Sequence, residues 1–353
     1  MAVQTINGIT LNYPGDPCTV FNPCKFILTG TMSRAKVRIT HGGRNYDATY
    51  QTPNGGALDL REFLQAFFDG LSMGQQFTQM SDVVASELGK SVNITITALN
   101  AANTTLATFN LTIYCVWGGT AVGEDYELAS RTGTKRVKWF SHYPFTVGLF
   151  TNTAATLNYV DDRQNAIKVL TLPAKGLYDI NIDDDGGSSV ESLHIYNDAS
   201  PFTEHYIIDI DRDADEGIYL RWVDRQGFWR YWLFKAGDPT RQAASRFGMW
   251  YRNDMALHDN LMGWQGAAGR RQSFSRNDVQ PLCAPLVDQA TFDMLQGVTT
   301  SPCVDMYLGK DSHDDPMWTA VTVEAGQYTK DVKKPEQDFV FNLVLPEIPV
   351  QTL

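Results

Sequence analysis

Alternation of apolar and polar side chains with a period of two recurs along this chain, and it restricts the chain to a mainly β fold. Residues 92–97 and 108–116 alternate apolar residues with Thr and Asn, a pattern typical of strands with one buried and one solvated face. Residues 218–223 and 228–234 are rich in aromatic side chains and flank a turn that contains Gly227, which tolerates a positive φ. These last two segments predict a β-hairpin, the strongest single element in the sequence.

The same period divides the side chains of the hairpin between two faces. Trp222 falls on the face that also carries Ile218 and Leu220, so we expect it to be buried in a core. Arg221 and Arg230 mark the faces that we expect to reach solvent or an acidic partner.

One segment of the N-terminal region has helical rather than strand spacing. Apolar residues in 59–71 recur along one stripe, which predicts a helix packed on a sheet. Asp59, followed three residues later by Glu62, resembles a capping box at the start of this helix. The stripe consists of Leu60, Phe63, Leu64, Phe67, Phe68 and Leu71.

A second helix is predicted at residues 288–295, with Asp288 as its N-cap and Gly297 beyond its end. With so few helices, the sequence predicts a mainly β, multidomain protein of β-sandwich-like domains and a few short helices. A length of 353 residues, at about 150 residues per domain, predicts two or three domains. The expected parts are a β-rich N-terminal domain with one helix (1–118), a linker (119–134), a central β domain with the aromatic hairpin (135–237), and an Arg/aromatic arm with a C-terminal α+β domain (238–353).

Charge and hydropathy exclude several classes of partner. The net charge of −11 argues against nucleic acid, because phosphate binding needs a positive potential. No stretch approaches the roughly 18 consecutive apolar residues of a membrane-spanning helix. The first eight residues lack the basic start and apolar core of a signal peptide. We therefore expect a chain made in a cytoplasm, whose five cysteines are free, buried thiols.

Two acidic segments fit either a metal site or ordinary loops. Residues 181–186 begin like a calcium loop, but Ser192 occupies the position of the bidentate Glu that such a loop requires. Residues 209–215 alternate Asp with other residues, which suits a metal or, as we favour, a solvated loop. No H-E-x-x-H or G-x-S-x-G motif occurs. We expect no metal, no cofactor and no catalytic residue, and hence a protein that is not an enzyme.

Residues 238–276 differ in composition from the rest of the chain and predict a long loop or an arm. Six arginines interleave there with aromatic residues. Such a mixture occurs where single-stranded nucleic acid stacks on aromatic rings, and also at the hot spots of protein interfaces. Because Asp residues dilute the positive charge, we favour a protein interface. Its candidate residues are Arg246, Trp250, Tyr251, Arg252, Trp264, Arg270 and Arg271.

Four segments carry a resemblance that covers most of the chain: residues 21–26, 137–147, 218–234 and 318–346. They read FNPCKF, VKWFSHYPFTV, the aromatic hairpin, and a terminal pattern of WTAV, GQYT and DFVFNLVLP. Together they resemble uncharacterised virion proteins of phages and prophages of gut bacteria, of tail or baseplate type. That family supplies no catalytic residues. The resemblance implies a structural role in a virion whose proteins are made in the cytoplasm of the bacterial host.

The expected function is therefore that of a non-enzymatic structural subunit of a phage tail or baseplate. It would act through protein–protein interfaces in a symmetric homo-oligomer and with other virion proteins. Two alternatives stay open. One is a carbohydrate-binding β-sandwich protein that recognises a host surface glycan on Trp and Tyr platforms. The other is a glycan-cleaving enzyme, which would need two carboxylates across a cleft.

Overall fold

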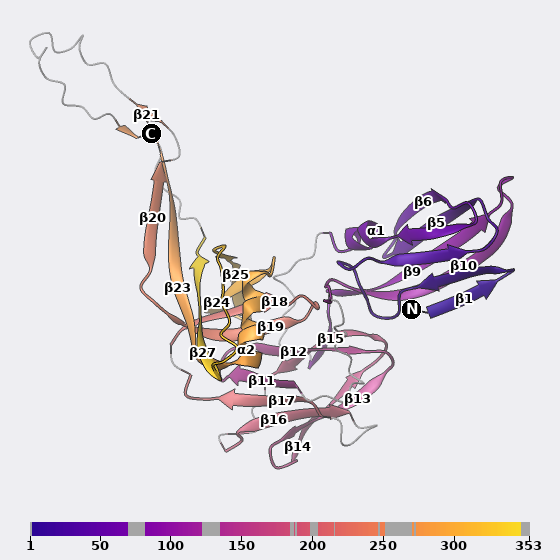
Figure 1. Cartoon of the computed structure of the whole chain (residues 1–353). Helices are drawn as coiled ribbons and strands as arrows, with labels where there is room; N and C mark the ends of the chain where they lie inside the picture. The colour runs from indigo at the N-terminus through magenta and orange to yellow at the C-terminus, as the bar shows by residue number, and fades with distance from the viewer. Residues whose placement is uncertain are drawn as a thin grey trace, which may run out of the picture.

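The structure, a computed structural model, consists mostly of β-strands. It describes residues 2–69, 82–121, 135–183, 187, 189–197, 204–214, 216–245, 248–250, 270–271 and 273–346. Several separate sheets with their own cores confirm the expected mainly β, multidomain fold. Figure 1 shows the N-terminal sheets at one side, the central sheets below, and the C-terminal sheet extending into a long two-stranded projection. Among the described residues, no helix is both long and apolar enough to cross a membrane.

Two sheets and a short helix, α1 (Arg61–Ala66), enclose the core of the N-terminal part. One sheet has the order β1 (Ala2–Ile6), β2 (Ile9–Tyr13), β4 (Lys25–Thr29), β7 (Gly55–Asp59). The other has the order β3 (Cys18–Thr19), β10 (Thr105–Val116), β9 (Gly89–Leu99), β5 (Arg34–His41), β6 (Arg44–Gln51).

Apolar and polar side chains alternate along the sequence of these strands, and in the structure the apolar ones point into the core while the polar ones lie on the opposite face. In β9, Val92, Ile94 and Ile96 are buried in the core between the sheets. On the opposite face, the Thr95 hydroxyl donates to the Asn110 side-chain oxygen of β10 at 3.0 Å. The apolar face therefore supplies the packing, while the Thr and Asn face forms a polar cross-strand ladder.

The central part also has two sheets around one core. The larger has the order β11 (Lys135–Phe140), β17 (Glu204–Asp211), β16 (Ser192–Asn197), β13 (Ala155–Asp161), β14 (Ala166–Leu172). The smaller has the order β12 (Phe145–Thr151), β15 (Gly176–Ile182), β8 (Val83–Ala85). Strand β8 lies in the segment expected to form the N-terminal domain, yet it belongs to this central sheet. The sheet therefore connects the N-terminal part to the central part.

The C-terminal part is one large sheet that contains the predicted hairpin. Its order is β25 (Pro316–Ala320), β24 (Val304–Lys310), β18 (Ile218–Val223), β19 (Trp229–Ala236), β23 (Phe274–Asp288), β27 (Glu336–Val344), β26 (Thr322–Val323), with β20 (Thr240–Ser245) also paired to β23. The hairpin β18–β19 is confirmed, with Gly227 at φ +83° in its turn.

The two helices differ in how well their sequences predicted them. Helix α2 (Gln289–Gln296) is confirmed, because the Asp288 carboxylate accepts from the Thr291 N–H at 2.7 Å and Gly297 forms the C-cap. The expected capping box at Asp59 is wrong, since Leu60 is the N-cap of α1 and makes no side-chain cap bond. The Asp59 carboxylate instead accepts from backbone N–H groups of Cys24 and Arg61. Of the apolar stripe, Leu60, Leu64, Phe67 and Phe68 are nevertheless buried and Phe63 is half-buried, while Leu71 lies outside the described residues.

Candidate functional site

A two-stranded ribbon extends the C-terminal sheet away from the body of the molecule (Figure 1). Strand β20 pairs with β23 from Thr240 opposite Val279 to Ser245 opposite Phe274. Beyond Val279, β23 pairs with β27 and lies in the body. Among the described strands, residues 274–278 pair with β20 alone. The ribbon, defined as residues 240–245 and 274–278, is therefore a continuation of the sheet by two strands only.

No core covers the faces of the ribbon in the described part of the chain. Residues 240–244 are all exposed, and Phe274 is 40% exposed. The charged side chains of the ribbon pair with one another. A nitrogen of Arg241 lies 3.3 Å from an Asp278 carboxylate oxygen, and a nitrogen of Arg276 lies 2.8 Å from the other. A two-stranded ribbon without a packed face is marginally stable in water.

Three of the predicted interface residues, Trp250, Arg270 and Arg271, lie on a second pair of short strands, in the chain segment between β20 and β23. Strand β21 (Met249–Trp250) pairs antiparallel with β22 (Arg270–Arg271), which brings Trp250 opposite Arg270. For these two strands only the backbone is described. The other four candidates, Arg246, Tyr251, Arg252 and Trp264, lie outside the described residues. The sequence predicts a long loop or an arm for 238–276, and it does not predict the strands β20, β21 and β22 and the start of β23 that lie in this segment.

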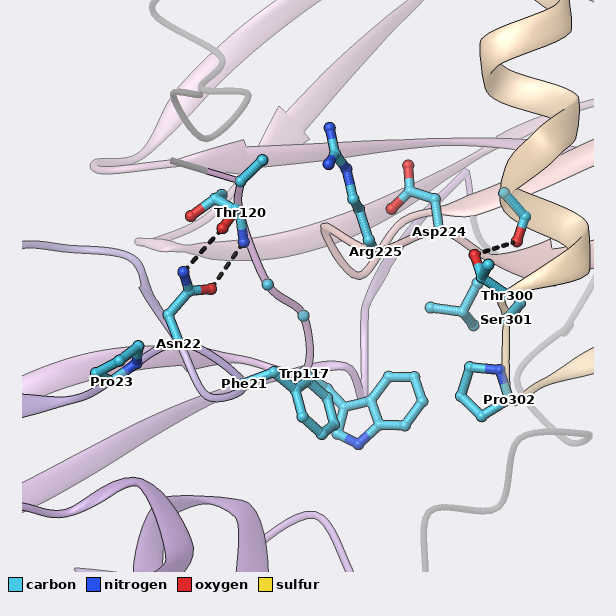
Figure 2. A pocket seen from close by; sticks show the side chains of 15 residues that line it. Phe21, Asn22, Pro23, Trp117, Thr120, Asp224, Arg225, Thr300, Ser301 and Pro302 are labelled. Carbon is cyan, nitrogen blue, oxygen red and sulfur yellow. Dashed lines mark hydrogen bonds between the residues drawn. The ribbon is translucent and has the colours of Figure 1, made fainter. Parts of the chain in front are cut away.

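A pocket of about 500 Å³ lies where the N-terminal sheets meet the C-terminal sheet. Figure 2 shows Phe21 and Trp117 on one side and Thr300, Ser301 and Pro302 on the other. The rings of Phe21 and Trp117 pack edge to face, with centroids 5.4 Å apart. The lining comes from residues 21–23, 117–121, 223–225, 297 and 300–302.

The polar side chains of this pocket are largely engaged with the protein itself. The Asn22 amide donates to the Thr120 carbonyl at 2.8 Å and accepts from the Thr120 N–H at 2.7 Å (Figure 2). The Asp224 carboxylate accepts from the N–H groups of Gln226 and Phe228 and from Arg230. The free surface is accordingly mostly apolar, which favours an apolar ligand or side chain over a strongly hydrogen-bonding one.

Two glycines allow the segment after β10 to lie against the hairpin turn. A Cβ on Gly118 would stand 2.7 Å from the Gln226 carbonyl carbon, too close for any other residue. A Cβ on Gly227 would stand 2.8 Å from Val116, and its φ of +83° is also unfavourable for other residues. The sequence does not predict this pocket, because its lining is spread over the chain. Gly118 and Gly227 are local signals of the close approach.

The hairpin carries two buried arginines, Arg221 and Arg230, so the expectation that they reach solvent is wrong, and each pairs with an acidic side chain of this chain instead. Arg221 is only 2% exposed, and its Nε donates to an Asp305 carboxylate oxygen at 2.9 Å. Its guanidinium lies over the rings of Trp229 and Trp318, at 4.5 and 4.3 Å from their centroids. Arg230 is also buried and pairs with Asp224 at 2.7 Å. A carboxylate makes each burial tolerable: Asp305 comes from β24, and Asp224 from the turn of the hairpin itself.

The carboxylate of Asp179 in β15 is also buried, and its charged form is destabilised. Burial raises the pKa of Asp179 to about 6, although the Ser86 hydroxyl and the Arg221 charge act in the opposite direction. Because this pKa lies above that of an unfolded Asp, the folded state prefers the protonated form. The associated stability is fully present below about pH 4 and is lost as the pH rises through about 6.

Replacing Asp179 with Asn should therefore remove a pH-dependent loss of stability. We expect Asp179→Asn to raise the free energy of unfolding by about 3 kcal/mol at neutral pH and to change little below about pH 4. Urea unfolding of both proteins between these pH values checks this. Parallel stability curves for the two proteins would show that Asp179 does not titrate in this range.

The acidic segments make ion pairs with neighbouring strands. Asp209 of β17 pairs with Arg136 of β11 at 2.5 Å, and Asp211 pairs with Lys138 at 2.7 Å. Asp183 pairs with Lys168 at 2.7 Å. Residues 184–186 and 215 lie outside the described residues. Within the described chain, no group of three or more His, Cys, Asp and Glu side chains is placed to hold a metal ion.

Comparison with known proteins gives no relative that identifies the chain. No family model matches. No curated protein matches. A chain from a study of host cell surface retention of a 1.5-MDa bacterial ice-binding adhesin is 10% identical, with a TM-score of 0.18, over 95% of this chain and 96% of that chain. A protein of unknown function from Porphyromonas gingivalis W83 is 8% identical, with a TM-score of 0.16, over 57% of this chain and 99% of that chain. These values are too low to support an argument about function.

Proposed function

We propose that this chain is a non-enzymatic structural subunit of an assembly of the phage tail or baseplate kind. The ribbon and its tip would bind a neighbouring copy of the chain in a symmetric oligomer, and other virion proteins would bind the same assembly. The observation that supports this most is the ribbon, whose residues 240–244 are exposed and which pairs with nothing on the outer edge of β20 in the described chain.

An exposed strand edge and uncovered faces favour association over an isolated state. An unpaired edge offers backbone N–H and C=O groups to another strand, and proteins usually protect or use such an edge. The segment carried by the ribbon contains Trp250, Tyr251, Arg252 and Trp264, residue types in which interface energy concentrates. The resemblance to virion proteins supports the same function and, with it, a location in the virion.

Carbohydrate binding and glycan cleavage stay as hypotheses. The pocket does combine Phe21 and Trp117, rings of the kind that stack on sugars. However, Asn22 and Asp224 already hydrogen-bond to protein groups, so few polar groups there are available for sugar hydroxyls. This pocket therefore adds little support to either alternative.

The interface proposal predicts that Trp250→Ala weakens assembly without unfolding the subunit. Trp250 lies at the ribbon tip, distant from the cores, so the melting temperature of the dissociated chain should not change. Truncation of an interface Trp typically costs 2 kcal/mol or more, roughly a 30-fold weaker association. Light scattering across a concentration series measures this shift.

The control for Trp250→Ala is Phe21→Ala, which removes a half-exposed aromatic ring from the N-terminal part of the chain. Phe21 is 48% exposed and should leave the mass distribution unchanged. Equal loss of assembly in both variants, or unfolding of Trp250→Ala, would argue against the ribbon tip as the interface.

A further inference from the structure

Three of the cysteines meet at one edge of the N-terminal sheets. The Sγ atoms of Cys18 and Cys24 are 3.0 Å apart. Cys18 of β3 is also the direct neighbour of Cys115 in the parallel pairing of β3 with β10. All three are buried, with exposed fractions of 5%, 1% and 0%. All three are free thiols in the structure.

The chain between Cys18 and Cys24 is shaped as a closed loop. The Asn22 N–H donates to the Thr19 carbonyl at 3.2 Å, which turns the chain back on itself. The Cys24 thiol then lies 3.5 Å from the Asn22 carbonyl and beside the Cys18 sulfur. Bonded sulfurs stand about 2.05 Å apart, so closure of a bond requires movement of about 1 Å.

We propose that Cys18 and Cys24 are a disulfide pair, which forms a bond across the loop 18–24 when the chain meets an oxidising disulfide. The Cys18 thiolate attacks the external disulfide, forms a mixed disulfide and releases one thiolate. The Cys24 thiolate then attacks the Cys18 sulfur and releases the second. The two protein thiols lose two protons and two electrons, and the external disulfide is reduced to two thiols.

Burial and hydrogen bonds disfavour the reactive thiolate form of both cysteines in the folded chain. The hydrogen bond with Cys115, followed by burial, raises the pKa of the Cys18 thiol well above its usual range. The hydrogen bond with Cys18, followed by burial, does the same to the pKa of Cys24. Because the thiolate is the attacking species, the bond should form quickly in a chain that is still folding and slowly in a folded one.

The bond would stabilise the contact between the N-terminal sheets and the C-terminal sheet. The loop 18–24 carries Phe21, Asn22 and Pro23, which form one wall of the junction pocket. Its backbone is already held, since the Val20 and Phe21 N–H groups donate to the carbonyls of Val116 and Gly118, each at 3.0 Å. A covalent closure removes alternative conformations of this loop from the unfolded chain.

To test this, the chain is refolded in a mixture of oxidised and reduced glutathione, and its reactive thiols are then counted after denaturation. We expect two fewer reactive thiols than the five cysteines of the sequence, and a peptide map that links Cys18 to Cys24. The oxidised chain should melt a few degrees above the same sample after reduction. Oxidation of an already folded sample should proceed much more slowly.

Two serine variants separate this pairing from its competitor. Cys115→Ser should keep the link and the gain in melting temperature, whereas Cys24→Ser should lose both. Five reactive thiols in the refolded wild-type chain would overturn the proposal. A link between Cys18 and Cys115 that persists in Cys24→Ser would overturn it as well.

Discussion

Replacing Arg221 with Met lowers the free energy of unfolding by about 3–5 kcal/mol, because it leaves Asp305 buried without its cation. The two side chains are 3% and 8% exposed, so water does not solvate the remaining carboxylate. The substitution also removes the guanidinium from between the rings of Trp229 and Trp318. Urea unfolding, followed by intrinsic tryptophan fluorescence, measures the loss.

The double variant Arg221→Met with Asp305→Leu provides the control for this result. It removes both charges, so a large part of the lost stability should return, and the double-mutant cycle should show strong coupling between the two positions. A loss below about 1 kcal/mol for Arg221→Met alone would place the pair among ordinary solvated ion pairs and contradict its burial.

The second large effect is expected at Trp222, which is fully buried in the C-terminal core. Trp222→Ala should cost about 3–5 kcal/mol, because truncation of a buried aromatic residue leaves a cavity that its neighbours fill only in part. Thermal unfolding monitored by circular dichroism should show a marked fall in melting temperature, with a substantial unfolded fraction at 37 °C if the starting stability is ordinary.

A conservative variant tests the cause of that effect. The Trp222 indole N–H has no hydrogen-bond partner among the described residues, so Trp222→Phe removes an unsatisfied donor along with part of the ring. Trp222→Phe should lower the free energy of unfolding clearly less than Trp222→Ala does. Equal losses of unfolding free energy in the two variants would show that the cavity is not the cause of the destabilisation.

The sequence predicted those elements whose signals are local. The hairpin β18–β19 follows from period-two spacing and Gly227, and helix α2 from the Asp288 cap. The buried Trp222 follows from the same period. In each case the deciding atoms lie within a few residues of each other, so no distant segment has to be known.

The errors arose where a distant segment decides the environment. Arg221 was expected near solvent because its partner Asp305 is 84 positions away and reaches it only through the pairing of β18 with β24. The start of α1 was misplaced because the Asp59 carboxylate binds the backbone of Cys24 instead of capping the helix. The strands of the ribbon, in a segment predicted as a long loop or an arm, were not expected because polar, Arg-rich strands that face solvent have no alternation of burial to reveal them.

The central claim is that the ribbon binds a second copy of the chain, and the mass of the intact, unmodified chain in solution tests it most directly. Light scattering or analytical ultracentrifugation over a wide concentration range measures that mass. The account predicts a discrete multiple of the 39.5 kDa subunit that dissociates on dilution. A constant mass of 39.5 kDa at every concentration would contradict it.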